Sequence, residues 1–448
     1  MKQMTNSQPF PEAFKQRVEN DTFLGEQLLT VLNETAPVSV RLHPLKQKAE
    51  LTFTEKIAWC EHAFYLNERP SFTLDPLFHA GCYYPQEAGS MVLDTVLKQL
   101  DLPSQPSVLD LCAAPGGKST LIAAFLNNNG LLVSNEVIQS RARILTENTT
   151  KWGYTNTVVT NNDPKDFERL NEFFDVIVVD APCSGEGMFR KDIKAREEWS
   201  EDNVQLCSSR QKRIVMDVWD SLKPGGYLIY STCTFNSAEN EENVAWYLNE
   251  LPATYVQLKM PEELVAGRNN IGHYCLPGKT ISEGFYIAIL QKEETTPLRQ
   301  RFTRKPLFKV QKDLLDAENY VKLDEALLLN WNDKLLLVPN QLEEKMLHVQ
   351  AQMRIQKMGL MLGEIAKKGI IPSEELALNP TRLNRTSTIE LTEKEALMYL
   401  HGDTFSLQGP QGFQIVSYKN EPLGWIKNIG NRFNNLFPKE WRIRMNIQ

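Results

Sequence analysis

The chain has 448 residues, of which 42% are hydrophobic and 23% are charged, so it is long enough for about three globular domains. Its formal net charge of −7 argues against a protein that binds nucleic acid along its whole surface, and any RNA contact must be local. The seven cysteines include no C-x-x-C pair, and no apolar run reaches about 18 residues. We therefore expect no disulfide framework, no metal site and no membrane span, in a cytoplasmic protein.

The first 75 residues are expected to form a small α/β domain. Apolar residues recur at mostly helical spacing between Pro11 and Glu34, and a strand-like run follows at 38–42.

Residues 76–293 are expected to form a second domain, in which strands and helices alternate. The predicted strands are 108–111, 131–135, 157–160, 174–179 and 227–230, and the predicted helices are 86–100, 117–127, 139–152 and 202–222. Strands separated by helices of this length pair in parallel through crossovers, which predicts an open, doubly wound, Rossmann-like α/β sheet. A last apolar run at 284–290 is expected to add an edge strand.

After residue 293 the composition becomes polar and basic, so we expect a basic linker and middle domain at 294–385 and a β-rich module at 386–448. The stretch 298–312 contains six basic residues and no acid: Arg299, Arg301, Arg304, Lys305, Lys309 and Lys312. The tail interleaves basic residues with Trp425, Phe433, Phe437 and Trp441. Both stretches are candidate RNA contacts, although a solvated linker and an ordinary domain surface explain them equally well.

The turn Leu109–Lys118 follows the first strand of the predicted parallel sheet and is typical of a cofactor site. Gly116 and Gly117 let a ligand approach the backbone closely. Glu136 ends the next strand 19 residues after Gly117 (136 − 117), close to the spacing at which an acid accepts both ribose hydroxyls. Asp163, after the following strand, is placed to meet an adenine. S-adenosylmethionine fits best, because it has a ribose and a carboxylate but no pyrophosphate.

Two nucleotide-binding motifs are excluded at this turn. The G-x-G-x-x-G fingerprint is absent, and a P-loop NTPase is disfavoured because Cys112 stands where that motif requires glycine.

Cys183 and Cys233 each lie at the carboxyl end of a predicted strand, so we expect both in one crevice beside the cofactor. The C5 carbon of cytosine is a poor nucleophile, and its methylation requires a thiolate to add first at C6. An acid at N3 lowers the barrier to that attack, and Asp180, three residues before Cys183, fits this role. The alternative is that these thiols are buried small hydrophobes, which is our interpretation of the other five: Cys60, Cys82, Cys112, Cys207 and Cys275.

These motifs resemble those of the Sun-type RNA (cytosine-5) methyltransferases over about residues 35–290. The matching segments are Leu77–Met91, Leu109–Thr120, Val179–Gly187 and Ser231–Asn236. The resemblance implies a class I methyltransferase sheet with Cys233 as nucleophile, Cys183 assisting product release, Asp180 contacting the base and Lys118 close to cofactor and substrate. It also implies a cofactor wall formed by Cys112, Ala113, Ala114, Pro115, Gly116, Gly117, Lys118, Glu136, Arg141, Asp163 and Asp180. One departure is His43, which replaces an asparagine in the family pattern R-x-N-P-x-K.

The length and the β-rich tail are similar to those of bacterial family members that act on small-subunit ribosomal RNA and end in a PUA-like module. This implies a monomer whose partner is structured RNA, either 16S ribosomal RNA or the small subunit. A transfer RNA methyltransferase and a non-catalytic RNA-binding assembly factor remain alternatives. A DNA cytosine methyltransferase would use the Cys183 of its Pro-Cys pair, but the second strand-end cysteine would then have no role.

Overall fold

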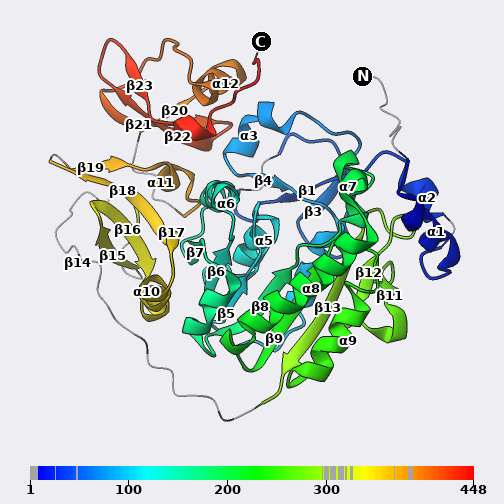
Figure 1. The fold of residues 1–448 in the computed structure, drawn as a ribbon. Helices are drawn as coiled ribbons and strands as arrows, with labels where there is room; N and C mark the ends of the chain where they lie inside the picture. The colour runs from blue at the N-terminus through cyan, green and yellow to red at the C-terminus, as the bar shows by residue number, and fades with distance from the viewer. Residues whose placement is uncertain are drawn as a thin grey trace.

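The computed structural model describes residues 9–447 except 26, 47–48, 368 and 382–386, and between 295 and 325 it describes only 296, 302, 309–310, 317 and 320–322. Most of the basic stretch 298–312, including Arg299, Arg301, Arg304, Lys305 and Lys312, lies outside the described residues. The described residues form four β-sheets, of which the largest lies at the centre of the molecule (Figure 1).

The N-terminal segment contains helices α1 (Glu12–Asn20) and α2 (Leu28–Val31), followed by a four-stranded sheet of order β2-β3-β1-β4. Its strands are β1 (Val38–Leu42), β2 (Phe53–Lys56), β3 (Ala63–Leu66) and β4 (Tyr83–Pro85), and the short helix α3 (Pro76–His79) precedes β4. The predicted strand at 38–42 is therefore confirmed.

The central sheet has ten strands in the order β11-β12-β13-β9-β8-β5-β6-β7-β17, with β10 also paired to β13. The strands are β5 (Ser107–Asp110), β6 (Leu131–Asn135), β7 (Thr157–Thr160), β8 (Phe174–Asp180), β9 (Leu222–Thr232), β10 (Ala253–Tyr255), β11 (Val265–Ala266), β12 (His273–Cys275), β13 (Phe285–Lys292) and β17 (Ile355–Met358). The helices of this region are α4 (Val92–Leu97), α5 (Gly117–Leu126), α6 (Gln139–Trp152), α7 (Ile193–Glu198), α8 (Glu201–Val218) and α9 (Glu241–Glu250). Strands β9, β8, β5, β6 and β7 are parallel, which confirms the predicted Rossmann-like sheet.

Two expectations for this region are wrong in detail. The helix expected at 86–100 covers only Val92–Leu97, because the Glu87 carboxylate accepts the N–H groups of Gly89 and Ser90 and fixes a 3-10 turn in front of it. Strand β13 is not an edge strand, because β10 and β12 pair with it beyond β9. These added strands have only three residues each, too few to show a periodic pattern.

Hydrophobic residues alternate between the two faces of the central sheet and are buried on both. Leu109 and Ile177 pack with Val215 of α8 and Val244 of α9 on one face. On the other face the neighbouring residues of the same strands, such as Val108 and Val178, pack with residues of α4 and α5. Burial on both faces explains why these strands are continuously apolar in the sequence.

The C-terminal part has two further sheets, of order β14-β15-β16-β18-β19 and β20-β21-β22-β23. Their elements are β14 (Lys309–Val310), β15 (Ala326–Trp331), β16 (Lys334–Pro339), α10 (Glu343–Gln352), β18 (Leu360–Ala366), β19 (Gly369–Pro372), α11 (Glu374–Leu378), β20 (Thr388–Glu390), α12 (Glu393–His401), β21 (Gly412–Tyr418), β22 (Glu421–Asn428) and β23 (Phe433–Asn435). Strand β17 lies in this part of the sequence but belongs to the central sheet, where it pairs antiparallel with β7. A hydrophobic cluster also joins Tyr399 and Leu423 of the last module to Val40 and Leu77 of the N-terminal segment.

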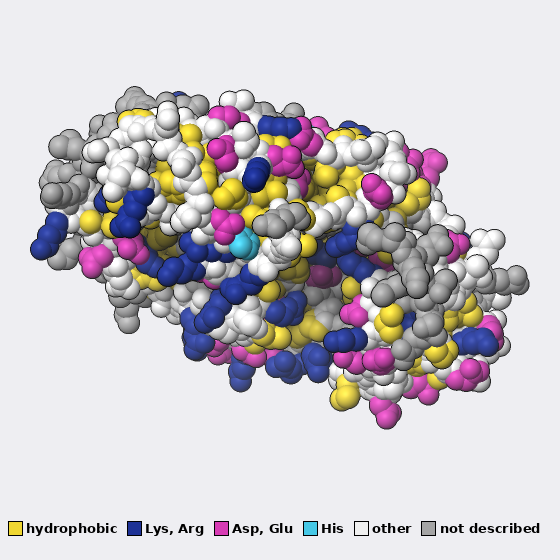
Figure 2. Space-filling view, turned by 90° about the horizontal axis from the view of Figure 1, so that it is seen from above, with side chains coloured by type: hydrophobic (Ala, Val, Ile, Leu, Met, Phe, Trp, Pro, Cys, Tyr) yellow, Lys and Arg dark blue, Asp and Glu magenta, His cyan; other side chains and the backbone are white. Residues whose placement is uncertain are grey.

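Basic side chains gather in a band across the face of the molecule seen in Figure 2, although the net charge is negative. In the tail, the aromatic residues Trp425 and Phe437 are buried in hydrophobic clusters, whereas Lys427, Arg432 and Lys439 are exposed. Trp425 and Phe437 therefore belong to the core and are not available to stack on RNA. In the part of the chain that the structure describes, no helix has the length and apolar character needed to cross a membrane.

Candidate active site

A cavity of about 290 Å³ lies at the carboxyl ends of β5, β8 and β9, and we call it the thiol cavity. The turn after β5 contributes Cys112, Ala113, Ala114, Pro115, Gly117 and Lys118 to its wall. Asp180 and Cys233 line it from the ends of β8 and β9. The segments 84–87 and 283–285 also line it, together with Met188 and Lys191. Residues 84–87 lie within one of the matching segments of the sequence, but sequence reasoning assigned none of these residues to the site.

The pairing of β8 with β9 brings the two predicted thiols together. The register places Asp180 opposite Ser231, so the loops that follow the two strands leave the sheet side by side. The sulfur atoms of Cys183 and Cys233 lie 3.0 Å apart, and the Cys233 backbone N–H donates to the Cys183 sulfur at 3.3 Å. The hydrogen bond with Cys233 and burial raise the pKa of the Cys183 thiol well above its usual value. The raised pKa favours the neutral thiol of Cys183, and either sulfur of the pair can be the donor of the hydrogen bond between them.

Asp180 and Lys118 form an ion pair on the wall of the thiol cavity. Lys118 Nζ lies 2.7 Å from Asp180 Oδ2, and Ser231 Oγ donates to Asp180 Oδ1 at 2.9 Å. Lys118 Nζ also lies 5.0 Å from the centre of the Phe285 ring, a favourable cation–π position. These contacts fix a carboxylate and an ammonium group beside the thiols.

The predicted cofactor turn is anchored to its surroundings by buried polar groups. Gly116 has a φ of 118°, a conformation that favours glycine, where helix α5 begins. Ala113 N–H donates to Asn135 O at 2.8 Å, which ties the turn to the end of β6. Beneath the turn, Ser119 Oγ donates to Asp110 Oδ2 at 2.6 Å, and burial raises the pKa of Asp110 to about 7. Burial likewise raises the pKa of Cys112, which favours its neutral thiol.

Four other residues of the predicted cofactor wall do not line the thiol cavity: Gly116, Glu136, Arg141 and Asp163. Glu136 is 3% exposed, accepts the Ile138 N–H at 2.9 Å and pairs with Arg141 at 3.4 Å. Arg141 also donates to the Ala114 carbonyl at 2.8 Å, so the Glu136–Arg141 ion pair helps to hold the turn after β5 in place. Asp163 is exposed and accepts the Lys165 N–H at 3.1 Å. Their contact with a cofactor remains a prediction.

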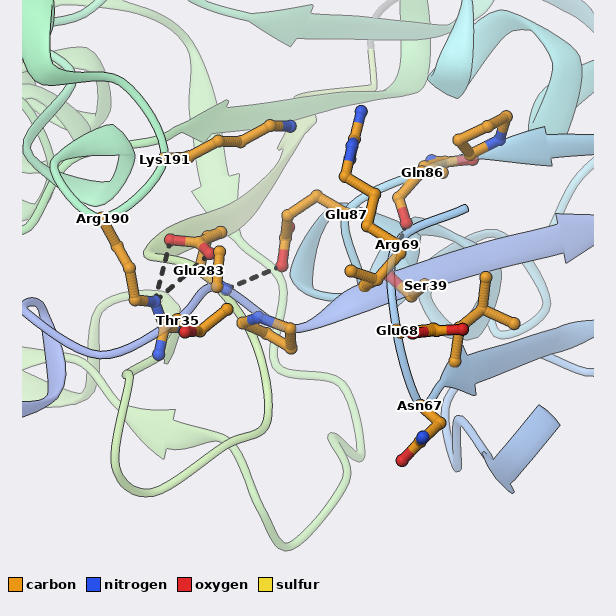
Figure 3. Close-up of a pocket in the computed structure, with 15 residues that line it drawn as sticks. Thr35, Ser39, Asn67, Glu68, Arg69, Gln86, Glu87, Arg190, Lys191 and Glu283 are labelled. Carbon is orange, nitrogen blue, oxygen red and sulfur yellow. Dashed lines mark hydrogen bonds and ion pairs between the residues drawn. The ribbon is translucent and has the colours of Figure 1, made fainter. Parts of the chain in front are cut away.

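A larger cavity of about 860 Å³ adjoins the thiol cavity, and we call it the flanking cavity (Figure 3). It lies between the N-terminal sheet and the segment after Cys183. The two cavities share Pro85, Gln86, Glu87, Lys191 and Glu283. Arg190 pairs with Glu283 at 3.3 Å, and Glu283 N–H donates to Glu87 at 2.9 Å. Burial raises the pKa of Glu283 to about 7.

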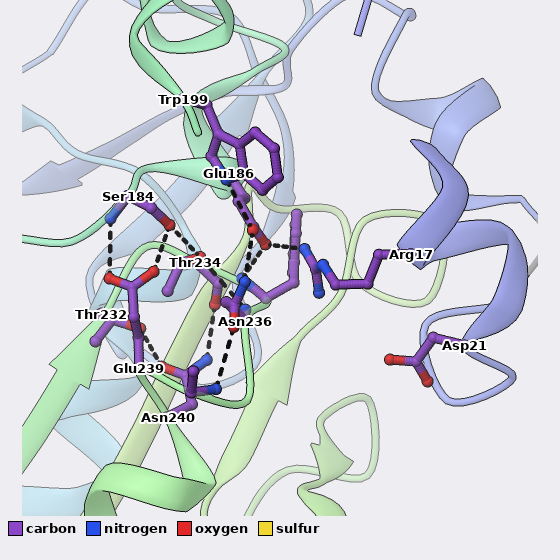
Figure 4. A network of polar contacts seen from close by, with 12 residues as sticks. Arg17, Asp21, Ser184, Glu186, Trp199, Thr232, Thr234, Asn236, Glu239 and Asn240 are labelled. Carbon is purple, nitrogen blue, oxygen red and sulfur yellow. Dashed lines mark hydrogen bonds and ion pairs between the residues drawn. The ribbon is translucent and has the colours of Figure 1, made fainter. Parts of the chain in front are cut away.

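A buried polar network joins the loop of Cys183 to the loop of Cys233 (Figure 4). The Glu239 carboxylate accepts hydrogen bonds from the Ser184 N–H, at 2.9 Å, and from Ser184 Oγ, at a very short distance. Ser184 Oγ also lies 3.0 Å from Thr234 Oγ1. Ser184 and Thr234 are the residues directly after the two cysteines. Burial raises the pKa of Glu239 to about 7. Sequence reasoning missed Glu239, because nothing local distinguishes it from the nearby Glu241 and Glu242.

A second buried carboxylate connects the cysteine loops to the N-terminal helix α1. Glu186 is 0% exposed and accepts hydrogen bonds from Trp199 Nε1 at 3.0 Å and the Phe235 N–H at 3.2 Å. Arg17 of α1 pairs with it at 2.6 Å (Figure 4). The first helix of the chain is therefore part of the support of the site.

His43, the one departure from the family pattern, is fully buried. The Leu45 N–H donates to its Nδ1 at 3.0 Å, so Nε2 carries the proton and donates to the Trp152 carbonyl at 2.9 Å. Burial lowers the pKa of His43 to about 2, and the ring is neutral. His43 links β1 to the end of α6 and is not exposed to RNA. Among the described residues, no three His, Cys, Asp or Glu side chains gather as they would around a metal ion.

Three family models match parts of the chain. Residues 97–291 match the 16S rRNA methyltransferase RsmB/F, residues 10–88 match the N-terminal domain of 16S rRNA methyltransferase RsmF, and residues 386–443 match the methyltransferase RsmF PUA domain. The ribosomal RNA small subunit methyltransferase F of Shewanella loihica is 33% identical over 411 residues, or 86% of this chain and 83% of that protein. The protein of the same name from Shewanella putrefaciens is 34% identical over 441 residues, 90% of each chain.

Solved structures share the fold of the catalytic part. A methyltransferase homolog protein from Pyrococcus horikoshii is 27% identical with a TM-score of 0.54, and the match covers 63% of this chain and 95% of that one. NSun6 from the same organism, crystallised with SFG, has a TM-score of 0.55 at 21% identity, covering 64% of this chain and 99% of that one.

Proposed function

The chain belongs to the ribosomal RNA small subunit methyltransferase F family, and from this premise we propose that it methylates C5 of a cytosine in 16S ribosomal RNA. The methyl donor is S-adenosylmethionine, and the reaction passes through a covalent adduct between Cys233 and C6 of the base. The observation that carries the proposal is the pair of sulfur atoms 3.0 Å apart beside the turn after β5. In this chemistry one thiol attacks the base and a second thiol assists its release, so the reaction gives both strand-end cysteines a role.

The residues at the turn fit S-adenosylmethionine. Residues 112–115, 117 and 118 of the turn line the thiol cavity, and Gly117 has no side chain to block a ligand there. The buried Oδ1 atom of Asp110 has no hydrogen-bond partner among the described residues, but Asp110 lies beneath the turn and does not line the thiol cavity, so we assign it to the support of the turn. S-adenosylmethionine supplies an electrophilic methyl group when it is bound. We assign Glu136, Arg141 and Asp163 to the support and outer rim of this site.

The two thiols receive different roles because their surroundings differ. Cys233 lines the thiol cavity, whereas Cys183 lies behind it and donates to the Cys233 sulfur when Cys233 is a thiolate. This hydrogen bond stabilises the thiolate that attacks the base. Cys233 is therefore the nucleophile, and Cys183 is the group placed to assist its departure.

In the first step the Cys233 thiol loses its proton as its sulfur bonds to C6, and N3 of the ring gains one proton in exchange. The Asp180–Lys118 pair orients that edge of the base. With S-adenosylmethionine bound, C5, now enamine-like, would take its methyl group as the bond between that methyl and the sulfonium sulfur breaks, and the neutral thioether S-adenosylhomocysteine would leave. Loss of the C5 and N3 protons and cleavage of the bond between sulfur and C6 restore the aromatic ring. The target base must leave its stack to enter the cavity, which costs a few kcal/mol.

The surrounding segments supply the grip on RNA. We propose that residues 1–75 and 386–448 act as RNA-contacting units around the catalytic domain at 76–293, with 294–385 as a basic linker and middle domain. The exposed Lys427, Arg432 and Lys439 support this role for the last module. The protein acts as a monomer in this proposal.

The test is a nucleoside analysis of 16S ribosomal RNA after incubation with S-adenosylmethionine and the purified protein. RNA alone and assembled small subunits are compared, with transfer RNA as the competing substrate. We expect 5-methylcytosine in ribosomal RNA from the wild-type protein and none from Cys233→Ala. If methylcytosine forms only in transfer RNA, the substrate assignment is wrong. If no RNA is methylated, the chain is a non-catalytic binding protein.

A further inference from the structure

We propose that Arg69 and Lys191 hold the RNA backbone next to the target cytosine, with its phosphates in the flanking cavity. This inference rests on the proposed function and adds a substrate subsite to it. Both residues line the flanking cavity, and Lys191 also lines the thiol cavity, so it stands at the junction of the two.

The size and connection of the two cavities offer a route for the RNA. The thiol cavity, at about 290 Å³, has room for the reacting base and the reacting end of the cofactor but not for neighbouring nucleotides. The sugar and phosphates attached to the flipped base must continue into adjoining space. The flanking cavity, at about 860 Å³, shares five wall residues with the thiol cavity and provides that space.

The charges in the flanking cavity favour an anion between its walls. Figure 3 shows the side chains of Arg69 and Lys191 reaching toward one another from opposite sides. Neither forms an ion pair with another described residue, although the Arg69 guanidinium lies 5.4 Å from the centre of the Phe72 ring. Two cations that face each other repel, and a phosphate between them turns this repulsion into attraction.

The carboxylates of the same cavity already have partners. Glu283 pairs with Arg190, and Glu87 accepts N–H groups from Gly89, Ser90 and Glu283. Glu68, the remaining acid on the wall, is exposed and points away from Lys191 in Figure 3. Lys191 is close enough to Glu283 for its charge to favour that carboxylate, but neither Lys191 nor Arg69 forms an ion pair with another described residue, and we assign the phosphate contact to these two.

The test measures methylation kinetics of Arg69→Gln and Lys191→Gln at several KCl concentrations, with whichever form of 16S ribosomal RNA the wild-type protein methylates. Lys194→Gln is the matched control, because Lys194 is exposed three residues further along the chain and lines neither cavity. Each cavity variant should raise the KM for RNA about tenfold and reduce the slope of log kcat/KM against log salt by about one. The Kd for S-adenosylmethionine should stay at the wild-type value.

Each other result overturns the inference. If both cavity variants match Lys194→Gln in KM and in salt slope, neither residue contacts a phosphate. If they instead weaken S-adenosylmethionine binding as much as RNA binding, their role is structural. An active wild-type protein with unaffected variants refutes only this subsite, whereas a wild-type protein without activity refutes the proposed function and the subsite with it.

Discussion

Asp180 is the residue in the thiol cavity with the clearest polar geometry. Its two carboxylate oxygens have different partners, Lys118 at 2.7 Å and Ser231 at 2.9 Å. The ammonium of Lys118 and the hydroxyl of Ser231 hold the carboxylate at one orientation. A group oriented in this way can direct a hydrogen bond to the edge of a base without reorganising during the reaction.

At this residue we predict that Asp180→Asn lowers kcat about 100-fold, because the amide can neither hold the ion pair nor share a proton with N3. The matched control is Asp175→Asn, because Asp175 pairs with Lys223 at 2.7 Å at the end of β8 opposite to Asp180 and does not line the thiol cavity. Steady-state methylation assays of both variants provide the comparison. Equal losses of activity in both would mean that Asp180 acts only through stability.

The buried carboxyl of Glu239 should make the free energy of unfolding depend on pH. Its pKa is about 7 in the folded protein because of burial, above the value in the unfolded chain. At a pH between the unfolded-state pKa and the folded-state pKa of Glu239, the folded protein keeps a proton on this carboxyl that the unfolded chain has lost. The free energy of unfolding that Glu239 contributes therefore falls as the pH rises from the lower pKa to the higher one. Glu239→Gln stays neutral. The free energy of unfolding of Glu239→Gln, relative to that of the wild type, should therefore be higher at pH 8 than at pH 4 by on the order of 3 kcal/mol.

Urea unfolding of both proteins at the two pH values measures this difference. Glu242→Gln is the control, because Glu242 is exposed and its carboxylate accepts a hydrogen bond from Ser237 Oγ at 2.8 Å. If the two proteins differ in their free energy of unfolding by the same amount at both pH values, the pKa of Glu239 is not raised in the folded protein.

At the scale of elements, α1 is joined to the cysteine loops by one buried ion pair. Removing Arg17 leaves the Glu186 carboxylate buried with neutral hydrogen-bond donors only. We predict that Arg17→Met lowers the free energy of unfolding by about 2 kcal/mol, less than for a fully buried pair because Arg17 is partly exposed. On the same helix, Lys15→Met should cost less than 1 kcal/mol, because Lys15 and its partner Glu19 are about half exposed.

Chemical denaturation measures both losses, and the methylation assay shows whether α1 also positions the thiols. Similar losses for Arg17→Met and Lys15→Met would show that the contact with Glu186 contributes little.

The elements that could be predicted from the sequence are those with a strong local signal. Strands β6 and β7 and helix α6 have the expected bounds, because each is a buried or amphipathic run that ends at polar or turn residues. The proximity of Cys183 and Cys233 also followed, because the carboxyl ends of neighbouring parallel strands meet at one edge of a sheet.

Other features have no local signal. Glu239 and Glu186 act through contacts with segments distant in sequence, so their burial cannot be seen in their neighbours. The same is true of Trp425, whose position beside basic residues indicated an RNA contact but whose ring is 1% exposed in the core. The pairing of β17 with β7 joins segments almost 200 residues apart, and no pattern in either segment specifies the partner.

At the scale of the whole molecule, β17 makes the catalytic sheet depend on the C-terminal region. Met358 and Val349 lie in the same hydrophobic cluster as Val158 and Ile177 of the central sheet. A chain ending at residue 293 would leave β7 as an unpaired edge and expose this part of the cluster. We predict that it unfolds at a lower urea concentration than the full chain and associates in size-exclusion chromatography. Equal unfolding midpoints would mean that β17 adds little to the sheet.

Trapping of the covalent protein–RNA adduct distinguishes the proposed roles of the two thiols, in which Cys233 attacks the base and Cys183 assists its release. Cys183→Ala, Cys233→Ala and the double variant are incubated with S-adenosylmethionine and 16S ribosomal RNA or small subunits, then run on a denaturing gel. We predict that Cys183→Ala accumulates a protein–RNA adduct, whereas Cys233→Ala and the double variant form none. An adduct that persists in Cys233→Ala and disappears in Cys183→Ala would contradict the account, because it would make Cys183 the nucleophile.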